Sequence, residues 1–253
     1  MEQLFKFAFF PSLDTAIDFL SKMASYEDWD FSDSVNKNHA ILRGYLEHTY
    51  RKLIAEKKII YTADNNYACF HTGLVTNSLE DIYVLFKKNR IQNQQPFCFQ
   101  AFVKRSDAQY IHLFADNEPL RADFFDKPEE LIFNPHLNVV PQIDHIIQDN
   151  LYRLPVDLQG LPRNELVKRI EASIQETVKL TKTNYQIAVP QCFNGKIQLL
   201  LPLYLTAGSP NPDLCLAIIR VGSMYTARTC LTMKMAYGNA RLIVKPHSSW
   251  LHT

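Results

Sequence analysis

The dipeptide Asn194-Gly195 constrains the fold of this chain more than any other feature of its sequence. It separates two segments with the apolar patterning of strands, residues 185–193 and 196–205. Asn-Gly adopts the positive φ angles of a two-residue type I′ turn, which joins antiparallel strands and matches their twist. We therefore predict a β-hairpin at this place.

The hairpin is predicted to continue as an antiparallel β-meander. Residues 213–221 and 224–231 have strand patterning, and the Gly-Ser dipeptide between them predicts a turn. The continuous apolar run Leu199–Leu203 is typical of a strand that is buried on both faces. After the meander, apolar residues at helical spacing predict a closing helix over residues 232–242.

The elements upstream are predicted from the same two periodicities. Helices are expected over residues 14–24, 42–58, 79–88, 143–154 and 162–183. Strands are expected over residues 59–62, 67–72, 97–103 and 110–114. The second helix is followed by a hairpin, which is the order of a winged helix, but the same order is common in α+β domains that touch no nucleic acid.

The length of 253 residues suits one large domain or two small ones. The sequence shows neither an internal repeat nor a low-complexity linker, which favours a single α+β domain over residues 1–253. We expect a C-terminal antiparallel meander flanked by helices and an N-terminal helix-plus-hairpin portion. A possible subdivision separates that portion, residues 1–90, from a sheet-and-helix core, residues 91–253.

The composition is that of an ordinary soluble globular protein, with 47% hydrophobic and 21% charged residues. No apolar stretch reaches the roughly 18 to 20 residues of a membrane span. The first residues lack the basic region and cleavage site of a secretory signal. The five cysteines include no CxxC pair and are read as reduced thiols. We expect a cytoplasmic protein with no membrane partner.

Sequence motifs of well-known enzymes are missing. There is no GxxxxGK[ST] phosphate loop, GxGxxG, HExxH or GxSxG, which argues against NTPases, zincins and many hydrolases. The nearest metal candidates are Asp144, His145 and Asp149, but the two aspartates face different sides of a helix. We therefore predict no metal site and no cofactor.

Charge is unevenly distributed along the chain. From Thr183 onward there is a single acidic residue, Asp213, against six basic ones: Lys196, Arg220, Arg228, Lys234, Arg241 and Lys245. Two explanations stay open. The segment is a strand-rich core that is poor in carboxylates, or its cations gather around an anionic ligand such as phosphate or a nucleic-acid backbone.

Three places carry candidate functional residues. His145 and Asp149, with Arg153 one turn further, form a His-Asp-Arg patch or a row of solvated charges. On the closing helix, Lys234, Gly238 and Arg241 share a stripe, and the glycine indicates a close approach. The approaching group is a phosphate held by the two cations, with Arg241 binding in a bidentate manner, or it is a neighbouring strand against which Gly238 packs.

The third place is His71, which precedes Thr72 and Gly73 in a predicted strand. A glycine here can let a ligand or another backbone approach closely. The alternative is that His71 is a structural histidine whose hydrogen bonds are satisfied within the fold.

Several phrases occur in an order and spacing that resemble a known family. They are ACFHTGL at 68–74, IYVLF at 82–86, DHI at 144–146, AVPQ at 188–191, QLLLPL at 198–203 and MAYGNARL at 235–242. Together they resemble the bacterial and fungal family catalogued as domain of unknown function 3825. The resemblance covers nearly the whole chain and implies a single domain. It also implies work on RNA or nucleotides, because some members are joined to cold-shock-like or other RNA-binding modules.

The resemblance also implies two departures from the family pattern. Relatives more usually have asparagine where His71 stands and an acidic residue where Lys234 stands. If those side chains serve chemistry in relatives, that chemistry is altered or lost in this chain.

We expect an RNA- or nucleotide-interacting domain with a basic pocket on the C-terminal sheet. The pocket is expected to be formed by His145, Arg153, Arg228, Asn239 and Arg241, with Lys234 and His71 as further ligand contacts. The arginines would bind phosphate, Asn239 would orient a base or sugar, and His145 would be the general acid or base. One alternative is an enzyme that cleaves phosphodiesters or pyrophosphates with His145 as the proton carrier. Another is a protein-interaction scaffold.

Overall fold

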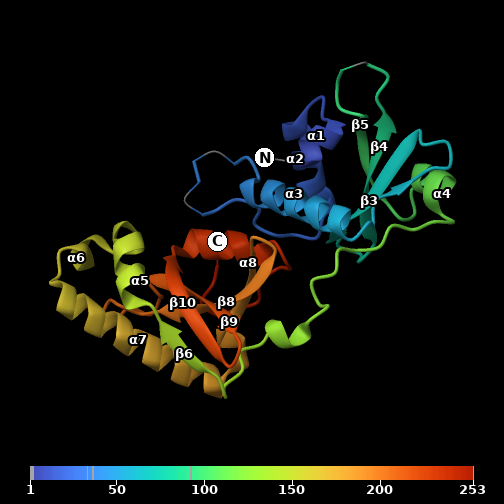
Figure 1. Cartoon of the computed structure of the whole chain (residues 1–253). Coiled ribbons are helices and arrows are strands. Elements are labelled where there is room, and N and C mark those ends of the chain that lie inside the picture. Colours follow the sequence, from blue (N-terminus) through green and yellow to red (C-terminus); the bar gives the residue numbers. More distant parts are fainter. Residues whose placement is uncertain (1–2, 33, 36, 92, 253) are drawn as a thin grey trace. The chain divides into compact units, whose positions relative to one another are not determined.

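The chain forms two compact units, Met1–Asp123 and Phe124–Thr253, which we call the N-terminal and C-terminal units (Figure 1). The computed structural model describes residues 3–32, 34–35, 37–91 and 93–252. The mixed α+β class predicted from the sequence is confirmed. The division between the units falls after residue 123, beyond the possible boundary at residue 90. Within the described ranges, no helix is long and apolar enough to cross a membrane.

The N-terminal unit is a five-stranded sheet with helices on both sides. Its elements in chain order are α1 (Gln3–Phe7), β1 (Ala8–Phe9), α2 (Leu13–Met23), α3 (Ala40–Ala55), β2 (Ile60–Tyr61), β3 (Tyr67–Val75), β4 (Asp81–Lys88), β5 (Phe97–Lys104) and α4 (Ala108–Phe114). The strand order is β1-β5-β4-β3-β2. Only the β1–β5 pair in this sheet is parallel. The predicted helix-plus-hairpin portion is present as α3, β2 and β3; a winged-helix role for it stays a prediction.

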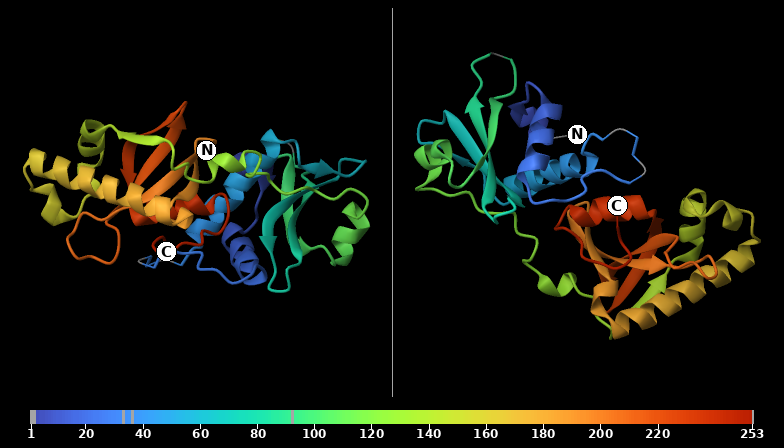
Figure 2. Two further views of the ribbon diagram at one scale, coloured as in Figure 1. Left: turned by 90° about the horizontal axis from the view of Figure 1, so that it is seen from below. Right: turned by 180° about the vertical axis from the view of Figure 1, so that it is seen from behind.

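The two sides of the N-terminal sheet carry different helices (Figure 2). On the α3 side, aromatic rings form the core, with Tyr50 of α3 lying 5.4 Å from the Phe70 ring. On the opposite side, which we call the α4 side, Tyr110 of α4 stacks on Tyr83 at 4.2 Å. Cys69 and Leu85 complete the buried cluster beneath α4.

The C-terminal unit is a second five-stranded sheet. Its elements are β6 (Asn138–Pro141), α5 (Ile143–Asn150), α6 (Val156–Gln159), α7 (Arg163–Thr183), β7 (Val189–Phe193), β8 (Lys196–Leu203), β9 (Leu214–Val221), β10 (Met224–Leu231) and α8 (Met233–Arg241). The 3-10 turn Pro128–Glu130 precedes β6, and two more, Leu151–Arg153 and Tyr185–Ile187, follow α5 and α7. The strand order is β6-β10-β9-β8-β7, with β6 parallel to β10 and all other pairs antiparallel.

The C-terminal sheet is also covered on two sides. On the α5–α7 side, Ile146, Ile170 and Ile174 pack against Leu201 and Leu216 of the strands. On the other side, which we call the α8 side, the Cys215 thiol lies 3.6 Å from the sulfur of Met233 in α8. In Figure 1, α7 and α8 accordingly lie on opposite sides of the strands.

The predicted meander and its first turn are confirmed. Asn194 and Gly195 have φ angles of 50° and 72°, as a type I′ turn requires. Within β8 all five residues of Leu199–Leu203 are buried. Helix α7 packs on one face of the strand, and α8, which packs on the adjacent strands β7 and β9, excludes water from the other face. The antiparallel sheet flanked by helices agrees with the sequence pattern.

The two sheets have the same topology although the sequence shows no internal repeat. In each unit a short first strand precedes two main helices, four consecutive antiparallel strands follow, and a last helix crosses to the second side. In each, the first strand pairs in parallel with the last one. Equivalent positions can therefore be compared between the units.

Two local predictions are wrong. The helix expected over residues 79–88 is strand β4, and the strand expected over residues 110–114 belongs to helix α4. Strand β4 is buried on both faces from Ile82 to Phe86, so its sequence shows no alternation of apolar and polar residues. Helix α4 has only seven residues and buries Tyr110 and Phe114, one turn apart, a pattern too short to identify its period.

Candidate functional site

The structure distributes the predicted site residues over both units and both sides of the C-terminal sheet. His71 lies in β3 of the N-terminal unit. His145 and Arg153 belong to the elements on the α5–α7 side. The other four lie in β10 or α8: Arg228, Lys234, Asn239 and Arg241. Within the C-terminal unit, the predicted residues therefore lie on two sides of the sheet and do not surround one pocket.

His145 lies on the outer surface of α5. Its side chain is 47% exposed, and its Nδ1 is 3.9 Å from the carboxylate of Asp149. Asp144, on the same helix, is paired with Arg163 of α7 at 2.6 Å. The charged neighbour of His145 in the structure is thus an acid, Asp149, and its role as a proton carrier stays a prediction.

Arg153 points into the fold rather than towards solvent. Its Nη1 donates hydrogen bonds to Asn150 Oδ1 at 2.8 Å and to the main-chain oxygen of Cys230 in β10. Asn150 is 2% exposed and also accepts a hydrogen bond from Thr229 Oγ1 at 3.0 Å. Since its donors are used in this way, Arg153 holds the end of α5 against β10.

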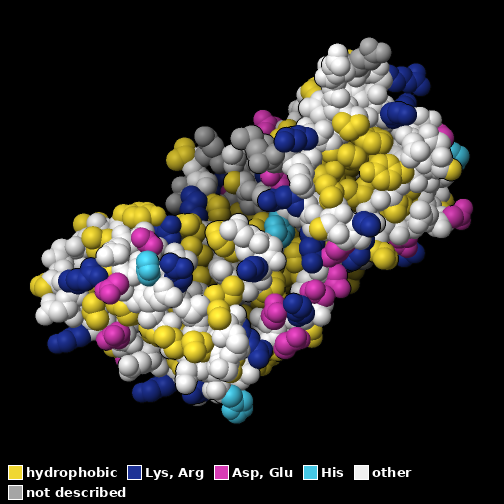
Figure 3. Space-filling model, viewed as in Figure 1, with side chains coloured by type: hydrophobic (Ala, Val, Ile, Leu, Met, Phe, Trp, Pro, Cys, Tyr) yellow, Lys and Arg dark blue, Asp and Glu magenta, His cyan; other side chains and the backbone are white. Residues whose placement is uncertain are grey.

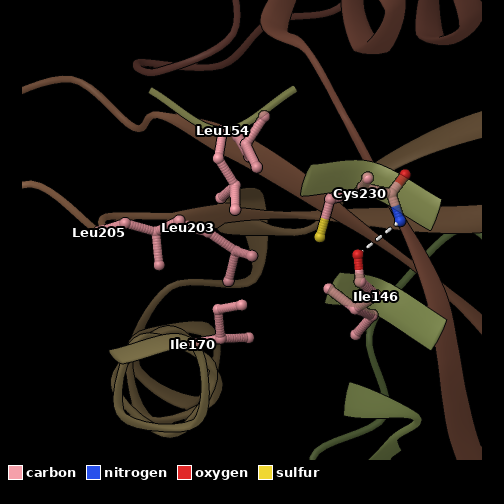
Figure 4. A pocket seen from close by; sticks show the side chains of 8 residues that line it. Ile146, Leu154, Ile170, Leu203, Leu205 and Cys230 are labelled. Atoms are coloured by element: carbon pink, nitrogen blue, oxygen red, sulfur yellow. Dashed lines mark hydrogen bonds between the residues drawn. The ribbon is translucent and has the colours of Figure 1, made fainter. Parts of the chain in front are cut away.

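The Asn150 amide borders a narrow gap in the core of the C-terminal unit (Figure 4). Its Nδ2 donates to the main-chain oxygen of Ile146 at 2.9 Å, the bond dashed in the figure. The other lining residues are apolar or cysteine: Ile146, Leu154, Ile170, Leu203, Leu205, Leu214 and Cys230. The gap leaves no room for a water-sized sphere, so it is a packing feature rather than a ligand pocket.

On the α8 side, amide groups connect the last helix to the sheet. Asn239 Nδ2 donates to Gln191 Oε1 at 3.0 Å, and Gln191 Nε2 donates to Gln198 Oε1 at 2.8 Å. Gln191 is only 1% exposed. Buried amides need such partners, because an unsatisfied polar group costs free energy. On the same helix Lys234 is exposed and Arg241 is buried.

Arg228 is an exposed cation of β10. The register of β10 against β9 shifts between Ala227 and Thr229, so Arg228 is the residue of this irregularity that pairs with no β9 residue. The strand alternation places it on the α8 side, since Tyr225 and Ala227 belong to the core opposite. Its guanidinium pairs with no carboxylate among the described residues.

The strands of the C-terminal sheet and helix α8 contain no carboxylate. Strands β6 to β10 and helix α8 contain five basic residues, Lys196, Arg220, Arg228, Lys234 and Arg241, and neither aspartate nor glutamate. The acidic residues of this unit lie in α5, α6, α7, the turn Pro128–Glu130 and the loops. The charge asymmetry in the sequence is thus also an asymmetry between elements of the folded unit.

His71 is the centre of a separate polar network in the N-terminal unit. It is 3% exposed, and its Nδ1 accepts a hydrogen bond from the Gly73 main-chain N–H at 2.8 Å. Arg121 Nε–H is placed to donate to the other ring nitrogen, Nε2, so a donor faces each nitrogen and a doubly protonated ring would oppose both. Nε2 lies 3.3 Å from Asp81 Oδ1 and 3.1 Å from Arg121 Nε. Asp81 and Arg121 are also paired directly.

The environment of His71 favours the neutral ring. Burial, followed by the positive charge of Arg121, lowers its pKa to about 4, and Asp81 opposes this shift only in part. Protonation at Nδ1 would also break the bond from Gly73. Gly73 itself has a φ of 81°, and the group that approaches it is the Tyr45 hydroxyl of α3. In this structure the close approach predicted at Gly73 is therefore made by a side chain of the same unit.

No group of three or more His, Cys, Asp or Glu side chains in the described ranges is placed to hold a metal ion. The family model of the domain of unknown function (DUF3825) matches residues 20–250, which is most of the chain. The chain belongs to this family. No curated protein and no solved structure matches it.

The DUF3825 match includes all of the predicted site residues and both units of the chain. Sequence reasoning overlooked three residues that the fold makes important. Asn150, Gln191 and Asp81 form the centres of buried polar networks, and each stands next to apolar residues in a predicted element. Only Gln191 had a local signal, as a polar residue between Pro190 and Cys192 in a predicted strand, because buried polar groups are hydrogen-bonded. Asn150 and Asp81 follow other polar residues, Asp149 and Glu80, and had no such signal.

Proposed function

We propose that the C-terminal unit binds the phosphate groups of RNA or of a nucleotide on the α8 side of its sheet. The observation that carries the proposal is the absence of carboxylates from β6 to β10 and α8, together with the exposed cations Lys196, Arg228 and Lys234. The other two cations of these elements do not contribute, because Arg220 pairs with Tyr225 of the opposite core and Arg241 is buried. A polyanion that approaches these elements meets cations without the repulsion of interspersed acids.

The state of these cations supports the same proposal. Lys196 and Arg228 are exposed and pair with no carboxylate in the described part of the chain. By contrast, Arg163 and Arg169 of α7 are paired with Asp144 and Glu165 at 2.6 and 2.9 Å. An unpaired cation can bind phosphate without first losing an ion pair, so Lys196 and Arg228 are the preferred contacts.

The proposal differs from the pocket expected from the sequence. His145 and Arg153 are left out, since one lies among acids and the other donates to the fold. Arg228 and Lys234 are retained as exposed residues. Asn239 contributes by holding α8 against Gln191, which fixes the surface that carries these cations.

The test is binding of a single-stranded RNA oligomer over a range of salt concentrations, measured by fluorescence anisotropy. Each lost phosphate contact lowers the slope of log affinity against log salt by about 0.7 for a single strand. Arg228→Ala and Lys196→Ala should each weaken binding and reduce the slope by about this amount. Arg169→Ala, which removes a paired cation of α7, is the matched control and should behave like the wild type.

Unchanged slopes in both Arg228→Ala and Lys196→Ala would refute the proposal. The same titration with a mononucleotide in place of the oligomer distinguishes the two ligand classes. RNA is the ligand if only the oligomer binds with a slope that both variants reduce. A nucleotide is the ligand if the mononucleotide binds as tightly as the oligomer.

A further inference from the structure

Four side chains form a row across the α4 side of the N-terminal sheet. Phe9 of β1 pairs with Cys98 of β5, Cys98 pairs with Lys87 of β4, and Lys87 pairs with Tyr67 of β3. Directly paired residues in neighbouring strands point to the same face of a sheet. We call these four residues the aromatic row, because it has an aromatic ring at each end and a lysine between them.

The aromatic row is open to solvent. Phe9 is 42% exposed, Lys87 is exposed, and Cys98 and Tyr67 are half-buried. Helix α4 covers the far end of the same face, where Tyr110 stacks on Tyr83. Figure 3 shows hydrophobic side chains gathered over β3, β4 and β5, with Lys or Arg side chains beside them. An apolar patch on a monomer surface marks a binding site more often than a solitary exposed residue does.

The charge near the row identifies the kind of ligand. No acidic residue occurs between Ile82 and Val103, the segment that forms β4, β5 and their connection. The same segment contains Lys87, Lys88 and Arg90. Lys87 Nζ lies over the Tyr67 ring, 5.8 Å from its centre, so a positive charge is held at the face of this ring. Beside Tyr67 an acidic residue, Asp64, lies in the turn before β3, where its carboxylate accepts hydrogen bonds from Thr62 and Asn66. A surface that combines aromatic rings with cations, on strands β4 and β5 that carry no acid between Ile82 and Val103, is complementary to unpaired bases on a phosphate backbone.

We propose that the aromatic row binds the unpaired bases of single-stranded RNA, with Phe9 and Tyr67 each stacking on one base. Three strand spacings separate the two rings, about 14 Å at roughly 4.8 Å per strand. Two rings that sandwich one base stand only about 7 Å apart at a stacking distance of roughly 3.4 Å, so these two rings take different bases. A duplex is excluded as the ligand of the row, since its base faces are covered by their neighbours.

This inference extends to the N-terminal unit and rests on the proposed function only in taking RNA as the common ligand. The C-terminal unit is proposed to contact phosphates, whereas the aromatic row contacts bases. The C-terminal unit therefore requires the phosphates of an oligomer, whereas the aromatic row requires its bases. A strand without bases keeps the phosphates and removes everything on which Phe9 and Tyr67 can stack.

The experiment compares a single-stranded RNA oligomer with an abasic oligomer of the same length, both labelled for fluorescence anisotropy. The variants are Phe9→Leu and Tyr67→Leu, in which leucine keeps an apolar side chain and removes the aromatic face. Each should bind the RNA about 5- to 100-fold more weakly than the wild type. Each should bind the abasic oligomer with wild-type affinity.

The matched control is Tyr61→Leu. Tyr61 of β2 is 43% exposed, close to the value for Phe9, but it pairs with Ala68 and contacts Phe97 on the α3 side of the sheet. It should bind both oligomers as the wild type does. Circular dichroism melting shows whether each of the three variants is folded. Only folded variants are compared with the wild type in RNA affinity.

The outcomes separate this inference from the proposed function. Wild-type RNA affinity in folded Phe9→Leu and Tyr67→Leu, or equal losses on the RNA and the abasic oligomer, would overturn the base-stacking row. If the wild type is a dimer and both variants are monomers that bind RNA as the wild type does, the row mediates self-association. That result would also overturn the base-stacking proposal. If Arg228→Ala changes nothing while the row variants bind RNA weakly, the proposed function fails and the aromatic row stands.

Discussion

Replacing His71 with asparagine should remove part of the pH dependence of the stability of the N-terminal unit. The imidazole is 3% exposed, and its pKa falls from 6.5 to about 4 in the folded chain through burial and the charge of Arg121. In the unfolded chain the ring titrates near 6.5. The unfolded chain therefore binds more protons between pH 4 and pH 6.5, and stability falls as the pH decreases through this window.

The expected magnitude follows from the two pKa values. Between pH 7 and pH 5, His71 should decrease the free energy of unfolding by about 2 kcal/mol. Burial raises the pKa of Asp81, but the hydrogen bond from Arg121 and the positive charge of Arg121 lower it on balance, so Asp81 remains ionised at both pH values. The pKa of His48 is also lowered to about 4 by burial, and its contribution is common to wild type and variant.

The assay is urea unfolding followed by circular dichroism at pH 7 and pH 5. The wild type should lose about 2 kcal/mol more than His71→Asn between these two values. His112→Asn is the control, because His112 is an exposed residue of α4 in the same unit, and it should retain the wild-type dependence. Equal pH dependence of the wild type and His71→Asn would refute the buried neutral imidazole.

Other substitutions test the packing. Gly73→Ala should lower the free energy of unfolding by about 1 to 3 kcal/mol, because a Cβ at a φ of 81° is strained and meets the Tyr45 hydroxyl; a neutral effect in urea unfolding would contradict this. Gly44→Ala, in α3 with open space around the new Cβ, should raise it by up to about 1 kcal/mol; a loss in the same assay would show that the site is not open. Asn150→Ala should cost about 1 to 3 kcal/mol by removing the buried acceptor that Arg153 and Thr229 share and the donor to the Ile146 carbonyl, and an unchanged urea midpoint would dispute that network. Residues 124–253 expressed alone should unfold cooperatively, since every strand pair of their sheet is internal, and a gradual transition would be inconsistent with a separate unit.

The parts of the fold that follow from local chemistry could be predicted from the sequence. The hairpin at Asn194 is set by the turn residues themselves, and the amphipathic helix after Pro162 by its own periodicity. The short strands β1 and β6 could not be predicted, because each exists only through a parallel partner far along the chain. The strand β4 was assigned as a helix because burial on both faces removes the alternation that identifies strands.

The candidate site could be predicted only as a charge pattern. The excess of cations after Thr183 is visible in the sequence, but which side of the sheet each cation faces depends on strand register and on the irregularity at Arg228. His71 could be noted next to Gly73, but its partners Asp81 and Arg121 lie 10 and 50 residues further along the chain. Long-range pairing of this kind is decided by the tertiary fold.

One topology occurs twice in the chain, yet the open parts of the two sheets have different chemistry. In the N-terminal unit the exposed row has two aromatic rings and one lysine, whereas the C-terminal strands and α8 have five cations and no acid. Base stacking releases few counterions, while phosphate contacts release about one each, so the two proposed contacts respond differently to salt. Raising the salt concentration should therefore weaken the contribution of Arg228 much more than that of Phe9 and Tyr67. An RNA that binds both surfaces would lose its phosphate contacts first and keep a preference for unpaired bases.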